Sequence, residues 1–109
     1  MRTARLNEII HAPKRLQICA LLSPLEEAEF QFLRDELGVS DSVLSKHIKQ
    51  LEDAGYLSLR KAGLNGRQRT WARLTRKGRS AFAAHVAALM ELAGVAQADG
   101  GGRRSDSSK

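Results

Sequence analysis

The 109-residue chain contains one cysteine and two prolines, and only 5% of its residues are aromatic. The lone Cys19 cannot form an intramolecular disulfide, and its position in an apolar run predicts a buried, inert thiol. The apolar stretches at 16–25 and 81–96 are too short, or are interrupted by polar residues, so neither predicts a membrane span. The N-terminus lacks the apolar core of a signal peptide. We therefore expect a cytoplasmic protein without a membrane partner.

Motifs for catalysis and for metal binding are also missing. The sequence has no phosphate-binding glycine loop, nucleophile elbow or paired-carboxylate arrangement. Metal sites usually contain closely spaced ligand pairs, and His11, His47, His85 and Cys19 have no such spacing. We therefore expect no enzyme activity, no cofactor and no metal.

Positive charge is abundant and concentrated in one part of the chain. The formal net charge is +6 and the sequence pI is about 10.1, which favours a polyanionic partner. Residues 46–79 contain ten basic and two acidic side chains, whereas residues 1–45 contain five and seven. Residues 80–109 contain three of each. The polyanion-binding surface is therefore predicted within residues 46–79.

The length and a hydrophobic content of 42% indicate one globular domain. The Gly- and Ser-rich segment at 97–109 predicts a flexible tail, which leaves residues 1–96 as the domain. Apolar periodicity and helix start and stop signals together predict five helices. They cover residues 3–11, 13–22, 26–37, 41–54 and 76–95.

Local signals place the ends of these helices. Pro13 suits the first turn of a helix, and Gly38 supplies a left-handed position that ends one. Ser40 or Asp41 can cap the next helix, and Gly55 ends it. Acidic residues favour the positive end of the helix dipole, so the third helix is expected to begin with Glu26, Glu27 and Glu29.

The third and fourth helices are separated only by a short turn, and a strand pattern follows them. Leu44, Ile48 and Leu51 form the inner stripe of the fourth helix. Beyond Gly55 the apolar period changes to two, and Asn65-Gly66 is a strong signal for a hairpin turn. The predicted fold class is mainly α with a small two-stranded β-hairpin wing (α+β), a winged helix-turn-helix.

This arrangement predicts contacts to double-stranded DNA. An α-helix fits the major groove, and a basic hairpin beside it can reach phosphates or the minor groove. The candidate contacts at the predicted recognition helix are Ser40, Ser42, Ser45, Lys46 and Lys49. Those on the wing are Lys61, Arg67 and Arg69. The lysines can also be an ordinary solvated helix face, and the arginines can serve only to protect a strand edge.

The final helix predicts a second copy of the chain as a partner. It is apolar around most of its circumference, so one small domain cannot cover it. The candidate dimerisation residues are Leu6, Ile9, Ile10, Phe82, Val86 and Leu89. A twofold dimer places two recognition helices ~34–36 Å apart and predicts a pseudo-palindromic DNA site.

The sequence resembles MarR/ArsR-like winged helix-turn-helix regulators, in particular the small family of stand-alone winged-helix DNA-binding domains. The resemblance is carried by FQFLRDELGVSDSVLSKHIKQLEDAGYL at 30–57 and GRQRTWARLTRKGRSAF at 66–82, together with PKRLQICALL. It implies that the helix after the turn enters the major groove, that the hairpin is the wing, and that the terminal helices pair two subunits. The larger effector-binding additions of such regulators are missing, so a small-molecule effector stays unknown.

The predicted function is sequence-specific binding of double-stranded DNA by a homodimeric transcriptional regulator. The alternative is a winged-helix protein-interaction module without sequence-specific DNA binding, because a fold does not determine its function. RNA is a weaker candidate, since the major groove of duplex RNA is too narrow for a helix and exposed aromatic residues are scarce. Trp71 is expected to pack against the protein body or the dimer partner rather than to stack on a base.

Overall fold

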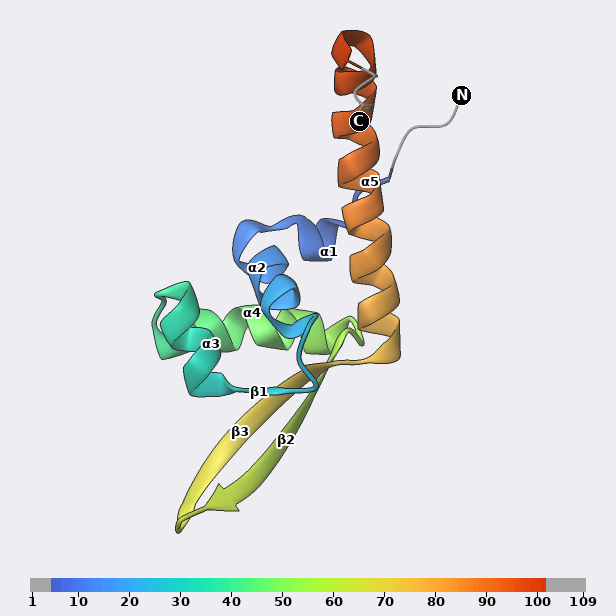
Figure 1. Cartoon of the computed structure of the whole chain (residues 1–109). Helices are drawn as coiled ribbons and strands as arrows, with labels where there is room; N and C mark the ends of the chain where they lie inside the picture. The colour runs from blue at the N-terminus through green and yellow to red at the C-terminus, as the bar shows by residue number, and fades with distance from the viewer. Residues whose placement is uncertain (1–4, 102–109) are drawn as a thin grey trace, which may run out of the picture.

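Five helices and three strands make up the part of the chain that the computed structural model describes, residues 5–101 without the side chains at 64 and 95–101. Helix α4 crosses the middle of the molecule, the β2–β3 hairpin extends away on one side, and α5 extends away on the other (Figure 1). This is the predicted winged-helix fold class. The elements in chain order are α1 (Glu8–His11), α2 (Pro13–Leu22), β1 (Ala28–Glu29), α3 (Phe30–Leu37), α4 (Asp41–Asp53), β2 (Leu57–Leu64), β3 (Arg67–Leu74) and α5 (Arg76–Gly101).

Most of the residues predicted to start, cap or end helices, and those predicted to form the hairpin turn, do so in the structure. Pro13 is the first residue of α2, and Gly38 ends α3 with a φ of 66°. Ser40 caps α4, because its hydroxyl accepts a hydrogen bond of 3.2 Å from the backbone N–H of Val43. The turn between β2 and β3 is the two-residue pair Asn65-Gly66, with φ angles of 55° and 78°. Positive φ at both positions matches the right-handed twist of the flanking strands.

The sheet has a third strand that the sequence did not predict. Its strand order is β1-β3-β2, and Ala28 pairs with Ala72 while Glu29 pairs with Trp71. The expected helix at 26–37 was therefore wrong at its start, since α3 begins at Phe30 and the three glutamates precede it. The free edge of β3 offers backbone groups to residues 28–29, and this pairing outweighs the weak local helix preference.

The first and last helices also differ from their predicted bounds. The helix expected at 3–11 begins only at Glu8, because Asn7 is extended and its side chain accepts a hydrogen bond from the N–H of Ile10. Residues 1–4 lie outside the described part. Helix α5 continues to Gly101, beyond the predicted end at 95 and into the segment expected to be a flexible tail, of which residues 102–109 lie outside the described part. Within the described residues, no helix is long and apolar enough to cross a membrane.

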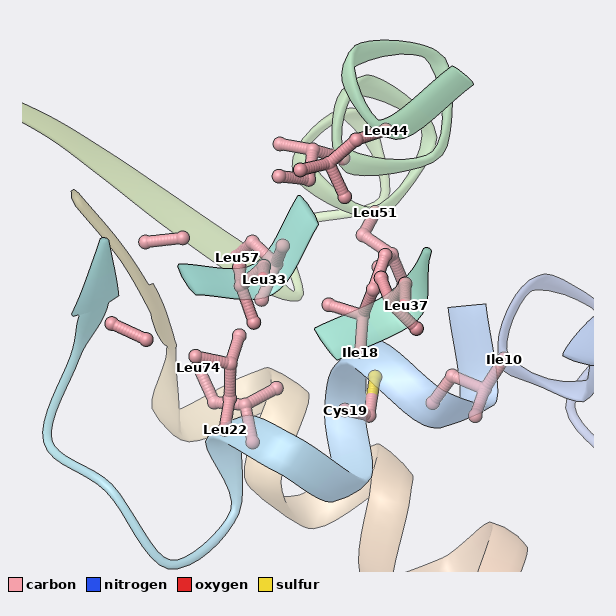
Figure 2. Packing of buried hydrophobic residues seen from close by; sticks show 13 residues of the cluster. Ile10, Ile18, Cys19, Leu22, Leu33, Leu37, Leu44, Leu51, Leu57 and Leu74 are labelled. Carbon is pink, nitrogen blue, oxygen red and sulfur yellow. The ribbon is translucent and has the colours of Figure 1, made fainter. Parts of the chain in front are cut away.

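One hydrophobic core joins the helices to the inner face of the sheet (Figure 2). Leu44, Ile48 and Leu51 face it from α4, as their spacing predicted. Ile10 is fully buried in the same core, so the expectation that it belongs to the dimer interface was wrong. The short α1 turns Ile10 inward because it packs on α2, a tertiary contact that the sequence pattern does not reveal.

His85 of α5 contacts Asn7, the residue before α1, and only 1% of its surface is exposed. Its Nδ1 accepts a hydrogen bond of 3.0 Å from the backbone N–H of Asn7, so the neutral ring has its proton on Nε2, which lies 3.4 Å from Nδ1 of His11. Burial lowers the pKa of His85, and the neighbouring His11 lowers it further. This tautomer leaves neither nitrogen of His85 a free lone pair for a metal ion.

Candidate nucleic-acid interface

The outward side of α4 carries the predicted polar row. Ser42, Ser45, Lys46 and Lys49 are all exposed, on the side away from the buried stripe. The Nζ atom of Lys49 lies 3.4 Å from a carboxylate oxygen of Asp53, and both side chains are exposed. Such a pair contributes little to stability, so Lys49 can exchange this partner for another anion. Ser40 is exposed too, but its hydroxyl is engaged in the cap.

A groove separates α4 from the wing. It has a volume of about 290 Å³ and is mostly apolar. The structure brings together three predicted site residues in its lining, namely Ser45 and Lys49 of α4 and Lys61 of β2. The other lining residues are Phe30, Ile48, Glu52, Leu59 and Thr70. The predicted recognition helix and the wing therefore both contribute side chains to one groove.

The two wing arginines differ in their surroundings. Arg67 follows the turn at the wing tip and is exposed. Arg69 is partly buried and forms an ion pair with Glu29 of β1. Both line a second groove of about 240 Å³, together with Arg34 and Asp41. Because a carboxylate offsets its charge, Arg69 is the weaker candidate for a phosphate contact.

Two residues at this interface were missed by the sequence analysis. Arg34 of α3 donates a hydrogen bond of 2.8 Å to Asp41, the first residue of α4. No local pattern indicates this contact, because it spans the turn between two helices. Val43 of α4 is 40% exposed although it is apolar. Its position outside the Leu44, Ile48 and Leu51 stripe is the sequence signal that identifies it as a surface residue.

The outer face of the sheet holds Trp71 and Arg60. Two guanidinium nitrogens of Arg60 donate to the carboxylate of Glu27, at 3.2 and 2.5 Å, and the guanidinium lies 5.5 Å from the centre of the Trp71 ring. The hydrogen bond from Arg60 lowers the pKa of Glu27. Trp71 thus packs within its own chain, one of the two possibilities expected for it, and Arg60 is already paired with an acid.

Basic residues at the start of α5 also make contacts inside the protein. Arg79 donates to the backbone carbonyls of Ser23 and Leu25, each at 2.9 Å, beyond the end of α2. The Nζ atom of Lys77 lies 5.7 Å from the centre of the Tyr56 ring. Both residues are exposed, but their charged groups already have partners inside the chain.

The predicted dimerisation residues are only partly available at the surface. Ile9 is 38% exposed, and Leu6, Val86 and Leu89 are half-buried, whereas Phe82 packs against the core of its own chain. More apolar surface is exposed further along α5, where Met90 is 68% and Leu92 is 43% exposed. Among the residues with described side chains, no group of three His, Cys, Asp or Glu is placed to hold a metal ion.

Comparisons with known proteins agree with the winged-helix fold. A family model described as a winged helix DNA-binding domain matches residues 14–93. An uncharacterized protein of Methanocaldococcus jannaschii is 35% identical over 85 residues, which are 78% of this chain and 92% of that protein.

Solved structures of regulators are similar as well. A transcriptional regulator homologue from Pyrococcus horikoshii OT3 has a TM-score of 0.78 at 26% identity, covering 83% of this chain and 89% of that one. A possible transcriptional regulator for arsenical resistance has a TM-score of 0.65 at 26% identity, covering 86% of this chain and 94% of that one.

Proposed function

Because the chain belongs to the family of winged helix DNA-binding domains, we propose that it is a transcriptional regulator that binds double-stranded DNA sequence-specifically as a homodimer. The expected resemblance to MarR/ArsR-like regulators holds for both family and fold. One observation carries the proposal: α4 presents an exposed row of serines and lysines beside a basic hairpin. A protein-interaction module has no need for such a concentration of positive charge.

Base recognition is assigned to α4. In the major groove each base pair presents a distinct set of hydrogen-bond donors and acceptors, which short polar side chains can distinguish. Ser42, Ser45, Lys46 and Lys49 face outward for this role. The exposed methyl groups of Val43 suit the methyl group of thymine. Each good base contact contributes ~1–3 kcal/mol of discrimination.

Phosphate contacts are assigned to the wing and to the groove between the wing and α4. Arg67 is exposed near the hairpin tip, so its charge is available to the DNA backbone or the minor groove. Lys49 of α4 and Lys61 of β2 both line the groove between α4 and the sheet. A DNA strand that follows this groove would contact both lysines. Arg69 contributes less, because Glu29 offsets its charge.

Dimerisation is assigned to α1 and the outer half of α5. Helix α5 extends away from the body of the domain (Figure 1), so its outer part cannot be covered by the core of its own chain. Ile9, Leu89, Met90 and Leu92 supply the apolar surface. A twofold partner buries this surface and sets two copies of α4 against successive turns of DNA, ~34–36 Å apart.

The deciding experiment is selection of bound sequences from random duplex DNA, followed by affinity measurements at several salt concentrations. We expect an enriched pseudo-palindrome and an affinity that falls steeply with salt, because bound cations displace condensed counterions. Unselective binding with a shallow salt dependence would instead favour the protein-interaction alternative.

A pair of variants tests the wing. Replacing Arg67 by Ala should reduce the slope of log K against log salt by about 0.9, the value for one phosphate contact on B-DNA. Arg69→Ala is the matched control, and its slope should change less because its charge is already paired. Equal slopes for the wild type and Arg67→Ala would remove Arg67 from the interface.

A further inference from the structure

Arg15 links three helices through one guanidinium group. It lies on α2, and its Nε donates a hydrogen bond of 2.5 Å to the carbonyl of Ile9 in α1. Its Nη1 donates a bond of 2.6 Å to the Oε1 of Gln50 and lies 3.2 Å from the Nδ1 of His47, both in α4. One side chain therefore bonds α1 and α4 at the same time.

All three partners of Arg15 are electrically neutral. A carbonyl, an amide and an imidazole accept its hydrogen bonds, and the planar guanidinium holds its donors in a rigid fork. No carboxylate of the described residues forms an ion pair with it. Arg15 therefore acts through the geometry of its hydrogen bonds, because their lengths and angles fix the position of α1 relative to α4.

The acceptors on α4 lie beside its outward polar row. His47 follows directly after Lys46, and Gln50 follows directly after Lys49. His47 and Gln50 lie on the side of α4 that faces α2, since both contact Arg15. A displacement of the guanidinium therefore acts on the two turns of α4 that carry the proposed lysine contacts.

The other end of this link reaches α5. The N-cap residue of α1, Asn7, donates its backbone N–H to the buried His85 of α5. The link from His85 to Gln50 thus consists of the hydrogen bond at Asn7, the backbone of α1, and the hydrogen bonds of Arg15. A shift of about 1 Å in α1 is enough to take bonds of this kind out of range.

We propose that Arg15 is a positioning residue that couples the placement of α1 and α5 to the orientation of α4 on DNA. The proposal rests on the proposed function, in which α4 recognises the bases. Through this link, a change at the helices assigned to dimerisation alters DNA affinity without any contact between those helices and the DNA.

The first test separates positioning from a phosphate contact. Arg15→Gln should weaken binding to the selected duplex by about 2- to 30-fold, with an unchanged salt slope. Arg15→Lys keeps the charge but not the fork, and it should bind nearly as weakly. The control Lys14→Gln removes the same charge from the neighbouring position, where Nζ donates only a long hydrogen bond of 3.4 Å to the Leu37 carbonyl, and should leave affinity within about twofold. A slope reduced in Arg15→Gln, or full affinity in Arg15→Lys, would overturn the proposal.

The second test uses the free protein. Burial lowers the pKa of His47, and the positive charge of Arg15 lowers it further, with smaller effects from Lys46 and Lys14. Arg15→Gln should therefore raise the pKa of His47, followed by NMR, more than Lys14→Gln does. An unchanged pKa in Arg15→Gln would show that the guanidinium does not face His47, and this result does not depend on DNA.

The third test concerns the route through α1. Asn7→Ala removes the side-chain cap of α1 but keeps the backbone N–H that bonds His85. In a double-mutant cycle of DNA affinity, its effect should be smaller when Arg15 is already Gln, because the link from α1 to α4 is then broken. Additive losses would refute the route. Failure of the wild type to bind duplex DNA would overturn the proposed function, whereas wild-type affinity in Arg15→Gln would overturn only the role of Arg15.

Discussion

Replacing Gly78 by Ala should destabilise the fold although alanine is the better helix former. Gly78 lies in the first turn of α5, directly against the backbone of Tyr56. A Cβ atom at this position would lie 2.1 Å from the Tyr56 carbonyl oxygen and 2.9 Å from its carbonyl carbon. The contact is with backbone, so no side chain can rotate away. Helix α5 has to move outward by about 1 Å to restore ordinary contact.

The size of the effect follows from two opposed contributions. Removing a glycine from a helix contributes about 1 kcal/mol in favour of alanine. Against this, overpacking costs ~1–3 kcal/mol, and each weakened hydrogen bond costs ~0.5–1.5 kcal/mol. The displacement strains the bond of 2.9 Å from Gly78 N–H to the Thr75 hydroxyl and the bond of 3.0 Å from Thr75 N–H to the Tyr56 carbonyl. We expect a net loss of about 2 kcal/mol, or a Tm lower by roughly 10 °C.

Gly94→Ala is the matched control, because it lies in the same helix and an added methyl group there would have no atom of another described element within 4 Å. It should stabilise the fold by about 0.5–1 kcal/mol through helix propensity alone. Both variants are compared with the wild type by thermal unfolding at one protein concentration, since dimerisation makes Tm concentration-dependent. A Gly78→Ala protein as stable as Gly94→Ala would refute the close approach of α5 to Tyr56.

Three further outcomes are expected. The free energy of unfolding should fall as pH drops below about 6.5, because the pKa of His85 is lowered in the folded protein and the unfolded chain therefore binds the proton first. Urea unfolding at two pH values checks this, and a free energy of unfolding that rises at the lower pH would contradict it. Met90→Glu should turn a dimer into a folded monomer in sedimentation equilibrium, and a persisting dimer would place the interface elsewhere. Ser45→Ala and Lys46→Ala should each change the preferred base at particular positions by ~1–3 kcal/mol, whereas a uniform loss across sequences would assign both to backbone contacts.

Much of the helical framework could be predicted because its signals act within one turn of chain. Pro13 starts α2, Ser40 caps α4, and Asn65-Gly66 forms the hairpin turn. The apolar spacing of α4 then separates its buried stripe from its outward row, since a helix repeats every 3.6 residues. These local rules were sufficient to predict the winged-helix class and to locate the candidate DNA contacts on α4.

The remaining features depend on segments that are distant in the sequence. Residues 28–29 pair with β3 because its edge lies beside them in the folded chain, and no period in two residues can indicate this. The same pairing places Glu29 against Arg69 and leaves Arg67 exposed, although the two arginines look equivalent in the sequence. The sequence by itself thus determined the helix periodicity, the turns and the position of the charge. Only the tertiary structure decided which cations are offset by a carboxylate, because that depends on distances between distant segments.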